Sequence, residues 1–452
     1  MRSRTPKVLQ PLAGQPLLCH VLAATAGLSP HATVVVLGHA SDQVRAVIPS
    51  GVTVALQNEP LGTGHAARCG LAALPASVDQ VLVVYGDTAL VRAETLRSVL
   101  AALAEAPVTL LTARLAEPRG YGRVIRDAAG WVRQLIEEAE LKPEQRSLDE
   151  VVGGVLAFDA AWLSERLPLL APHPNGEYYL TDLVKRATDE GTPARAVAAD
   201  DPTEAIGIND RLQLAQAHEV IYSRVRRRLL LEVGVSMPQP ASVFVEPGVA
   251  VGPDTVLLPN THLRGTTQVG SGCVIGPSTE LVDTQVGDDC RISWSVLEQA
   301  VVRDDVQIGP FCHLRPGTLL ESGVRLGNFV EVKNSRVGEA THAGHFSYIG
   351  DAELGRRVNV GAGTVTCNFD GVSKHRTIVG DDVFIGSDTM LVAPVQLGAH
   401  ARTGAGSVVT HDVKDGQLVV GVPARPVPGR SPRQSSAEES SEAGVARELR
   451  SE

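Results

Sequence analysis

Helical patterns and short apolar runs alternate along the first part of the chain. The segments with helical spacing are Pro16–Ala26, Asp42–Val47 and Ala66–Leu74, and the apolar runs are Thr33–Leu37, Val52–Leu56 and Gln80–Tyr85. Strands that are apolar throughout and separated by helices are typical of a parallel sheet covered on both faces. Ligands of such sheets bind beyond the carboxyl ends of the strands. Asp87, two residues after the last run, is therefore a candidate functional residue.

A longer helical pattern spans about 210–233 and carries four arginines, Arg224, Arg226, Arg227 and Arg228. Such a basic run fits either a nucleic-acid-binding patch or a solvated helix face that links two domains. The formal net charge of −10 argues against nonspecific nucleic-acid binding as the main activity. We therefore interpret the segment as a linker helix.

From about Val243 the pattern changes to an aliphatic residue followed by glycine, repeated at spacings of about six residues. The pair recurs from Val251-Gly252 through Ile308-Gly309 and Val360-Gly361 to Leu397-Gly398. This hexapeptide repeat predicts a parallel β-helix, in which each short strand points one aliphatic side chain inward and three strands make one triangular coil. Each coil buries its apolar face only against its neighbours, so many coils are needed for stability.

The chain is 452 residues long, more than one ordinary core accommodates, and two domains are expected. We predict an α/β domain over 1–208, a linker helix over 209–240, the β-helix over 241–427 and a disordered tail over 428–452. The six cysteines are scattered without a CxxC pair, which argues against metal clusters and a disulfide framework. The sequence has no signal peptide and no apolar run of about 18 residues, so we expect a cytoplasmic protein without a membrane segment.

Five short motifs of the first domain occur in the order in which one enzyme family carries them. Residues 57–66 read QNEPLGTGHA, 85–87 read YGD, 120–123 read GYGR, 177–182 read EYYLTD and 207–211 read GINDR. Each motif alone is compatible with a turn, but their joint order favours a functional origin. The chain resembles the bacterial bifunctional UDP-N-acetylglucosamine pyrophosphorylases that are also glucosamine-1-phosphate N-acetyltransferases. The resemblance extends from residue 1 to about residue 425.

The resemblance implies a Rossmann-like nucleotidyltransferase domain with a mostly parallel sheet. Gln57, Gly62 and Thr63 would hold the uracil base, and Asp87 with Asn209 would bind Mg²⁺. A few hard oxygen ligands, completed by substrate phosphates and water, suit this ion. The implied substrate site of the uridylyltransferase consists of Lys7, Gln57, Gly62, Thr63, Tyr85, Gly86, Asp87, Gly122, Glu137 and Asn209.

One position departs from the family pattern. The family has an asparagine that contacts the sugar in a segment of the form E-x-N-x-G, whereas residues 150–154 here read EVVGG, with Val152 in that place. Valine cannot donate or accept a hydrogen bond with a sugar hydroxyl. We expect altered sugar affinity or selectivity in this half.

The N-terminus matches only the end of the family's phosphate-binding signature. The family opens with a strand and a Gly-rich loop before a Pro-Lys pair, and this chain begins a few residues before Pro6-Lys7. Loss of a strand from inside a parallel sheet would leave unpaired backbone groups, each costing roughly 1–3 kcal/mol. We therefore expect Met1 to be an internal methionine of a longer protein, rather than the start of a protein that has lost the loop.

Polar residues interrupt the repeats between about 310 and 410, at places where a β-helix does not require them. Residues 314–317 read LRPG, 327–333 read GNFVEVK, 343–345 read AGH and 358–364 read VNVGAGT. A glucosamine amine is largely protonated near neutral pH, and a histidine is suited to remove its proton. An isolated His345 would more simply fill a turn, but Arg315, Lys333, Tyr348 and Asn359 accompany it in family order. His345 is therefore the candidate catalytic base.

The resemblance implies a left-handed parallel β-helix with two substrate regions. Arg315, Lys333, Tyr348 and Asn359 would bind the sugar phosphate. The implied acetyl-CoA residues are Ala362, Asn368, Phe369, Ser387 and Ala405. Phe369 replaces the family's usual tyrosine, a change that we expect to be tolerated, and Arg425 only weakly matches a C-terminal family arginine. The family's β-helices form homotrimers with acetyl sites between subunits, and the same is implied here.

The resemblance implies two consecutive reactions that make UDP-N-acetylglucosamine, a precursor of peptidoglycan and lipopolysaccharide. Acetyl is transferred from acetyl-CoA to glucosamine 1-phosphate. N-acetylglucosamine 1-phosphate is then joined to UTP, with Mg²⁺ as cofactor and pyrophosphate as product. The expected partners are these small molecules and further copies of the chain, with no nucleic acid and no membrane. Two alternatives remain: an acetyltransferase with an impaired uridylyltransferase half, and a non-catalytic regulatory subunit.

Overall fold

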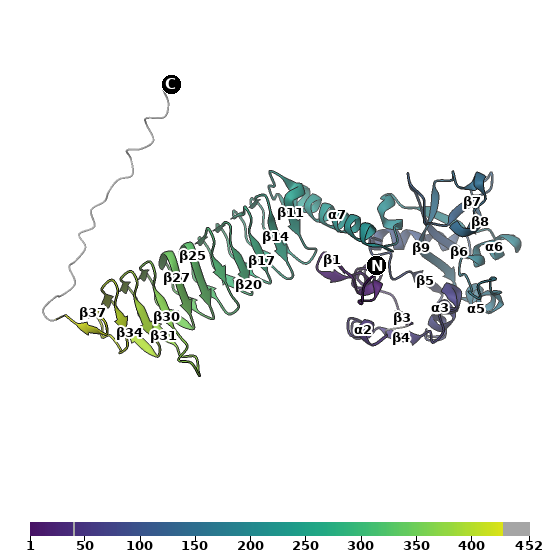
Figure 1. The fold of residues 1–452 in the computed structure, drawn as a ribbon. Helices are drawn as coiled ribbons and strands as arrows, with labels where there is room; N and C mark the ends of the chain where they lie inside the picture. Colours follow the sequence, from purple (N-terminus) through teal and green to yellow (C-terminus); the bar gives the residue numbers. More distant parts are fainter. Residues whose placement is uncertain (39–40, 428–452) are drawn as a thin grey trace, which may run out of the picture. The chain divides into compact units, whose positions relative to one another are not determined.

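The computed structural model describes residues 1–38 and 41–427, which form two compact units with a boundary between Arg224 and Val225 (Figure 1). The predicted disordered tail, 428–452, lies outside the described residues. Within residues 1–38 and 41–427, no helix is both long enough and apolar enough to span a bilayer. The two units correspond to the two patterns found in the sequence, alternating helices and strands in the first unit and hexapeptide repeats in the second.

The first unit is built on a six-stranded mixed sheet in the order β10-β6-β9-β7-β8, with β5 also paired to β9. The strands are β5 (Gln80–Val84), β6 (Val108–Arg114), β7 (Arg123–Arg126), β8 (Val132–Ile136), β9 (Glu150–Asp159) and β10 (Arg195–Ala198). Strand β9 is antiparallel to β5 and to β6, so these two run in the same direction on either side of it. The predicted parallel arrangement therefore holds for β5, β6 and β10, and β9 interrupts it.

Two further strands, β3 (Val34–Leu37) and β4 (Thr53–Leu56), form a separate parallel pair. Together with β5, they match the three predicted strands to within one residue at each end. The helices are α1 (Leu17–Ala26), α2 (Ser41–Arg45), α3 (Gly62–Leu71), α4 (Ala93–Ala101), α5 (Ala160–Arg166) and α6 (Asp182–Asp189). Helix α3 begins earlier than predicted because Gly62 adopts a φ of +90°, which turns the chain into the helix.

Helices cover both faces of the six-stranded sheet because β6 is apolar on both. Leu111 packs in one cluster with Leu96 and Val99 of α4. The preceding residue of the strand, Leu110, faces the opposite side and packs with the cluster that holds residues of α5 and α6. Successive side chains of a strand point to opposite faces, so a continuous apolar run requires a partner layer on each side.

Helix α7 (Arg211–Arg228) and the π-helical turn Leu229–Val233 occupy the predicted linker helix. The prediction of a solvated basic face was wrong for two of its arginines. Arg224 donates to the carbonyl of Leu90 at 2.6 Å and to Asp201 at 2.9 Å. Arg226 is buried and donates to the carbonyl of Val243 at 3.2 Å. These side chains anchor the helix, which the charge pattern alone does not reveal.

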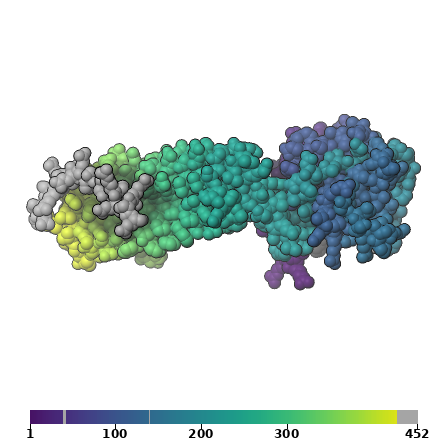
Figure 2. Space-filling view, turned by 90° about the horizontal axis from the view of Figure 1, so that it is seen from above, coloured from purple at the N-terminus to yellow at the C-terminus, as the bar shows by residue number. Residues whose placement is uncertain are grey.

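The second unit is a parallel β-helix that runs from β11 (Val243–Val245) to β38 (Ala424–Pro426), and its coils follow one another in chain order (Figure 1). The colours of Figure 2 show the same order, changing from teal through green to yellow along the unit. Nearly all its short strands pair in parallel with the equivalent strand of the next coil, and each typically points one aliphatic side chain inward. Full burial of one such side chain contributes about 1.5–3 kcal/mol. The inward residues form one continuous core, so the predicted β-helix of hexapeptide repeats is confirmed.

Candidate functional site

The loop that leads into α3 docks against the segment that precedes α6. The amide of Gly64 donates to the carbonyl of Tyr178 at 2.8 Å, and the amide of Tyr178 donates to the carbonyl of Leu61 at 2.9 Å. A Cβ on Gly62 would lie 2.6 Å from the Tyr178 carbonyl oxygen, so only glycine fits there. Thr63 Oγ1 accepts from the Leu180 amide at 3.0 Å. Two separate sequence motifs thus build one rigid turn.

Gln57 belongs to the same turn. Its Nε2 donates to the Gly62 carbonyl at 3.0 Å and lies 3.1 Å from His65 Nδ1. These contacts orient the side chain of Gln57 and fix the backbone around Gly62. The three residues predicted to hold uracil, Gln57, Gly62 and Thr63, are therefore adjacent in the structure.

A charged contact joins three distant segments at the carboxyl end of β5. Lys7 Nζ donates to Asp87 Oδ2 at 2.5 Å and to Asn209 Oδ1 at 2.8 Å. Gly86 lies beside Val8, where an added Cβ would meet the Val8 side chain at 3.2 Å. The carboxylate and carboxamide oxygens converge on one cation, and oxygens of these two types are the ligands that Mg²⁺ prefers. The predicted metal residues therefore fit a divalent ion.

The predicted sugar residues surround Gly122. An added Cβ on Gly122 would lie 3.7 Å from Glu137 Oε2 and 3.7 Å from Val152 Cγ1. Burial raises the pKa of the Glu137 carboxyl, and Thr181 Oγ1 lies 3.4 Å from its Oε1. Val152 thus occupies the predicted sugar region, where its methyl groups present an apolar surface beside the carboxylate.

Tyr85 links the metal region to the uracil turn. Burial raises the pKa of Tyr85 to about 12, so its hydroxyl stays protonated over the physiological range. A hydrogen bond with Thr63 acts in the opposite direction, and the charges of Glu137 and Asp87 add to the rise. Tyr85 is therefore a neutral hydrogen-bonding group between two carboxylates.

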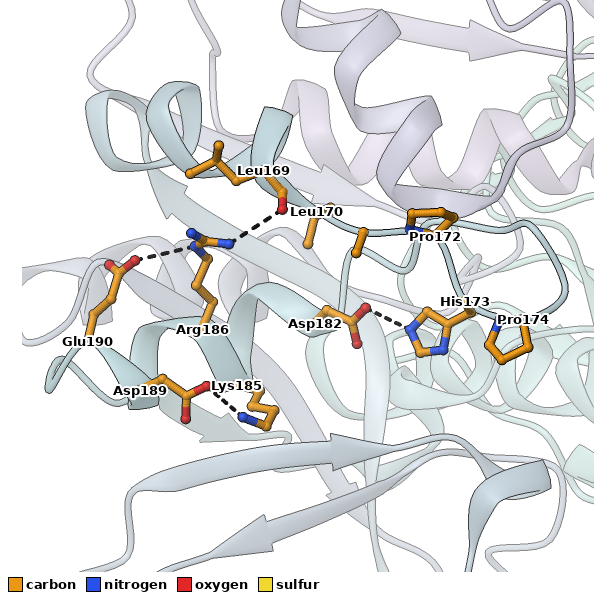
Figure 3. Close-up of a pocket in the computed structure, with 11 residues that line it drawn as sticks. Leu169, Leu170, Pro172, His173, Pro174, Asp182, Lys185, Arg186, Asp189 and Glu190 are labelled. Carbon is orange, nitrogen blue, oxygen red and sulfur yellow. Dashed lines mark hydrogen bonds and ion pairs between the residues drawn. The ribbon is translucent and has the colours of Figure 1, made fainter.

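A pocket of about 580 Å³ lies beside these residues but is lined by different ones (Figure 3). Its charged groups are already paired: His173 Nε2 lies 2.8 Å from Asp182 Oδ2, and Lys185 Nζ lies 2.5 Å from Asp189 Oδ2. The ring of His173 also packs on Tyr179 with centroids 4.2 Å apart. The pocket has paired charges and no predicted site residue, so we assign its walls a supporting role for the docked segment.

The β-helix places His345 beside a hydrogen-bond acceptor. Strands β25 (Arg325–Lys333) and β27 (His342–Gly350) pair in register, with Asn328 opposite His345. His345 Nδ1 lies 3.2 Å from Asn328 Oδ1. The coils approach closely here, because a Cβ on Gly327 would lie 1.9 Å from the Gly344 carbonyl oxygen. Since Oδ1 only accepts, Nδ1 carries the proton and Nε2 is the basic nitrogen of the neutral ring.

Three of the predicted acetyl-CoA residues occupy the position equivalent to His345 on the coils that follow. Continuing the register of β27 with β29 (Asn359–Val360) places Ala362 level with His345. The registers of β29 with β32 (Phe384–Ile385) and of β32 with β35 (Arg402–Thr403) place Ser387 level with Ala362, and Ala405 level with Ser387. We call His345, Ala362, Ser387 and Ala405 the corner column. It forms a track along the β-helix that begins at the candidate base.

A group of cations lies near the carboxyl end of β25, the strand that carries Asn328. The backbone pairing of β23 (His313–Leu314) with β25 sets Arg315 beside Lys333. Lys374 lies close enough to Lys333 that the second ammonium lowers the pKa of Lys374. Tyr348 folds over Gly350, where an added Cβ would lie 2.4 Å from its hydroxyl oxygen. Neighbouring lysines favour an anion between them, which fits a sugar phosphate.

Sequence reasoning did not identify Lys374, because it lies in a projecting loop far along the chain from Lys333. Asp351 connects the two parts. Burial acts to raise the pKa of Asp351, but hydrogen bonds from Asn334 and Asn368 and the charge of Lys333 outweigh it and lower the pKa. The sequence offered one indication of this role, because Lys374 follows the predicted acetyl-CoA residues Asn368 and Phe369 in the same polar loop.

The remaining predicted residues lie on the coils that follow. Asn368 is buried, and its Nδ2 donates to Asp351 Oδ2 at 2.5 Å, whereas the ring of Phe369 is exposed. Asn359 is exposed and lies level with His342, three residues before Ala362 of the corner column. Arg425 lies in the terminal hairpin of β37 (Leu418–Gly421) and β38. The structure thus links Arg315, Lys333 and Asn368 through neighbouring strands and Asp351, and it places Tyr348 three residues after His345 on β27.

Comparisons with known proteins match both units. Residues 1–167 match the family model of the MobA-like NTP transferase domain, and residues 376–411 match that of the bacterial transferase hexapeptide repeats. The chain is 44% identical over 426 residues to the bifunctional protein GlmU of Pelobacter propionicus, covering 93% of this chain and 92% of that protein. It is 46% identical over 441 residues to the protein of the same name from Thermobifida fusca, covering 95% and 91% respectively.

Proposed function

The chain belongs to the family of bifunctional GlmU proteins, and from that premise we propose how its residues carry out the two reactions. It is a bifunctional acetyltransferase and uridylyltransferase of UDP-N-acetylglucosamine synthesis, with a nucleotidyltransferase domain followed by hexapeptide repeats. This activity belongs to the synthesis of cell-wall peptidoglycan precursors.

His345 is the general base of acetyl transfer. The observation that carries this role is its contact with Asn328 Oδ1, which holds the proton on Nδ1 and leaves Nε2 free to accept one. Nε2 takes a proton from the amino group of glucosamine 1-phosphate as the nitrogen attacks the thioester carbonyl of acetyl-CoA. The new C–N bond forms, the C–S bond breaks, and coenzyme A leaves as the thiol after protonation.

Arg315, Lys333 and Lys374 bind the phosphate of the acceptor sugar, with Tyr348 beside them. Two ammonium groups and a guanidinium supply charge-assisted hydrogen bonds to an anion. Acetyl-CoA lies along the corner column, so that its thioester reaches the amine at one end. Ser387 supplies the one side-chain hydroxyl of the column, and the alanines leave room for the pantetheine chain.

The first unit joins N-acetylglucosamine 1-phosphate to UTP. The uracil binds the turn of Gln57, Gly62 and Thr63, and the sugar lies against Gly122 and Glu137. A phosphate oxygen of the sugar attacks the α-phosphorus of UTP, and the bond to the departing pyrophosphate breaks. Mg²⁺ held by Asp87 and Asn209 would neutralise charge on the phosphates, and positioning with charge neutralisation is the main source of catalysis in such transfers.

We also propose that the β-helix assembles as a homotrimer in the cytoplasm. Trp294, Phe311 and Phe329 form an exposed aromatic ladder on successive coils, with ring centroids 5.9 and 5.2 Å apart. His345 itself is exposed on the coil surface, and neighbouring chains would enclose it. Mass measurement of the full chain in solution should give three copies. A monomer, or a trimer that survives Phe311→Asp with Phe329→Asp unchanged, would count against this interface.

Separate assays of the two reactions test the assignment. His345→Ala should reduce acetyl transfer by about 10²–10⁴-fold and leave uridylyl transfer unchanged. Asp87→Ala should give the opposite pattern. Equal loss of both reactions in either variant would contradict two independent sites. An unchanged chain that transfers acetyl but not uridylyl groups would support the alternative of an impaired first unit.

A further inference from the structure

The two oxygens assigned to Mg²⁺ already bind one cation, the ammonium of Lys7. Nζ lies 2.5 Å from Asp87 Oδ2 and 2.8 Å from Asn209 Oδ1. The three residues come from different segments: Lys7 starts the 3₁₀ turn Lys7–Leu9, Asp87 follows β5, and Asn209 precedes α7. The Lys7 side chain is 37% exposed and that of Asp87 is 18% exposed. The ammonium ends a flexible four-carbon side chain that is partly exposed, so it has room to move.

An ammonium and a divalent ion cannot share these oxygens. Mg²⁺ binds its oxygen ligands at about 2.0–2.1 Å in octahedral geometry, and its remaining positions need water or phosphate oxygens. A lysine ammonium at hydrogen-bond distance from both oxygens fills that space and adds a like charge. One cation must leave before the other binds.

We propose that Lys7 is the resident cation of the metal site, displaced when the divalent ion enters. It neutralises Asp87 and holds the Asp87 and Asn209 oxygens within hydrogen-bond distance of one ammonium when no metal is bound. This inference rests on the proposed function, because it takes Asp87 and Asn209 as the metal ligands. It adds that Lys7 is a positioning residue that opposes metal binding in the substrate-free enzyme.

Displacement of Lys7 couples the metal to the nucleotide. The phosphates of UTP are an alternative partner for the freed ammonium. A nucleotide that attracts Lys7 therefore makes the two oxygens available, and metal binding in turn releases Lys7 for the phosphates. Such linkage is reciprocal, so UTP and the divalent ion should each strengthen binding of the other.

Mn²⁺ titration of the full chain, followed by the electron paramagnetic resonance signal of the free ion, tests the proposal without turnover. Without nucleotide, Lys7→Met should bind Mn²⁺ about tenfold more tightly than the unchanged protein, an ordinary magnitude for coupled sites. Lys7→Arg keeps a cation and should bind as weakly as the unchanged protein. Lys185→Met, which removes an exposed lysine elsewhere in the unit, should change nothing. Unchanged or weaker Mn²⁺ binding in Lys7→Met would overturn the proposal.

A second series separates this inference from the metal assignment. Asp87→Asn in the Lys7→Met background should abolish the tight Mn²⁺ site. Mn²⁺ binding that ignores Asp87 in every variant would refute the metal assignment itself. Binding that depends on Asp87 but is not tightened by Lys7→Met would refute only the role of Lys7. Lys7→Gln repeats the neutral substitution, and circular dichroism of each variant verifies that it is folded.

Discussion

Replacing Gly62 with alanine should open the contact between the uracil turn and the segment before α6. Gly51 provides a matched control, because both glycines have a φ of +90°. An alanine in this left-handed region costs about 1–2 kcal/mol at either position. An added Cβ on Gly51 meets nothing within 4 Å, so Gly51→Ala should show that cost alone.

At Gly62 a steric cost is added. The new Cβ would lie 2.6 Å from the carbonyl oxygen of Tyr178 and 3.0 Å from its amide nitrogen, both backbone atoms that cannot rotate away. The two segments must separate, which weakens the hydrogen bonds that join Tyr178 to Leu61 and Gly64 at 2.9 and 2.8 Å. Each such bond contributes about 1 kcal/mol, so Gly62→Ala should destabilise this contact by about 2 kcal/mol more than the conformational cost.

Hydrogen exchange measures this difference locally, which matters because a chain with two units need not unfold in a single step. A difference of about 2 kcal/mol corresponds to roughly 30-fold faster exchange at the amides of Gly64 and Tyr178. The KM for UTP should rise in Gly62→Ala and stay unchanged in Gly51→Ala. Equal exchange at these amides in the two variants would refute the steric argument, and an unchanged KM would separate the turn from uracil binding.

Three further outcomes are expected. Gly350→Ala should push Tyr348 away from the cation group, because the added Cβ would meet the tyrosine hydroxyl. The KM for glucosamine 1-phosphate should then rise about tenfold, which is the effect of losing one charge-assisted hydrogen bond. An unchanged KM would show that the tyrosine does not contact the substrate. A carboxylate hydrogen bond raises the pKa of His173 above 6.5, so the pair stabilises its segment fully below about pH 6.5 and loses this effect as the pH rises through the raised pKa. Hydrogen exchange of 173–182, corrected for intrinsic rates, should therefore depend on pH in the unchanged protein and not in His173→Gln. Arg92→Ala leaves the fully buried Glu204 without its cation and should lower the free energy of unfolding of the first unit, followed by its own urea transition, by about 3 kcal/mol. This value is at the low end because Arg92 is itself half-exposed. A loss below about 1 kcal/mol would place this pair with exposed ion pairs.

Local patterns predicted the helices and strands between residues 17 and 84, because the causes of these elements are local, whereas strands β6, β7, β8 and β10 and helices α4, α5 and α6 were not predicted. The strands at 34–37, 53–56 and 80–84 follow from short apolar runs, and their predicted bounds were within one residue of the observed ones. Strand β9 was not predicted, and its antiparallel place between β5 and β6 depends on pairing with both at once. The arginines of α7 were misread for the same reason, since their partners lie outside the helix.

The six-residue period was sufficient to predict the β-helix, because every coil contacts only its neighbours and the same period recurs in each coil. The sequence also indicated the site residues, but only as separate motifs. Tertiary structure alone decided that Lys374 lies beside Lys333, that Asn328 orients His345, and that Lys7 binds both oxygens of the predicted metal site. These contacts join residues whose separation along the chain is set by coil length and sheet order, and no short pattern of residues records such a distance.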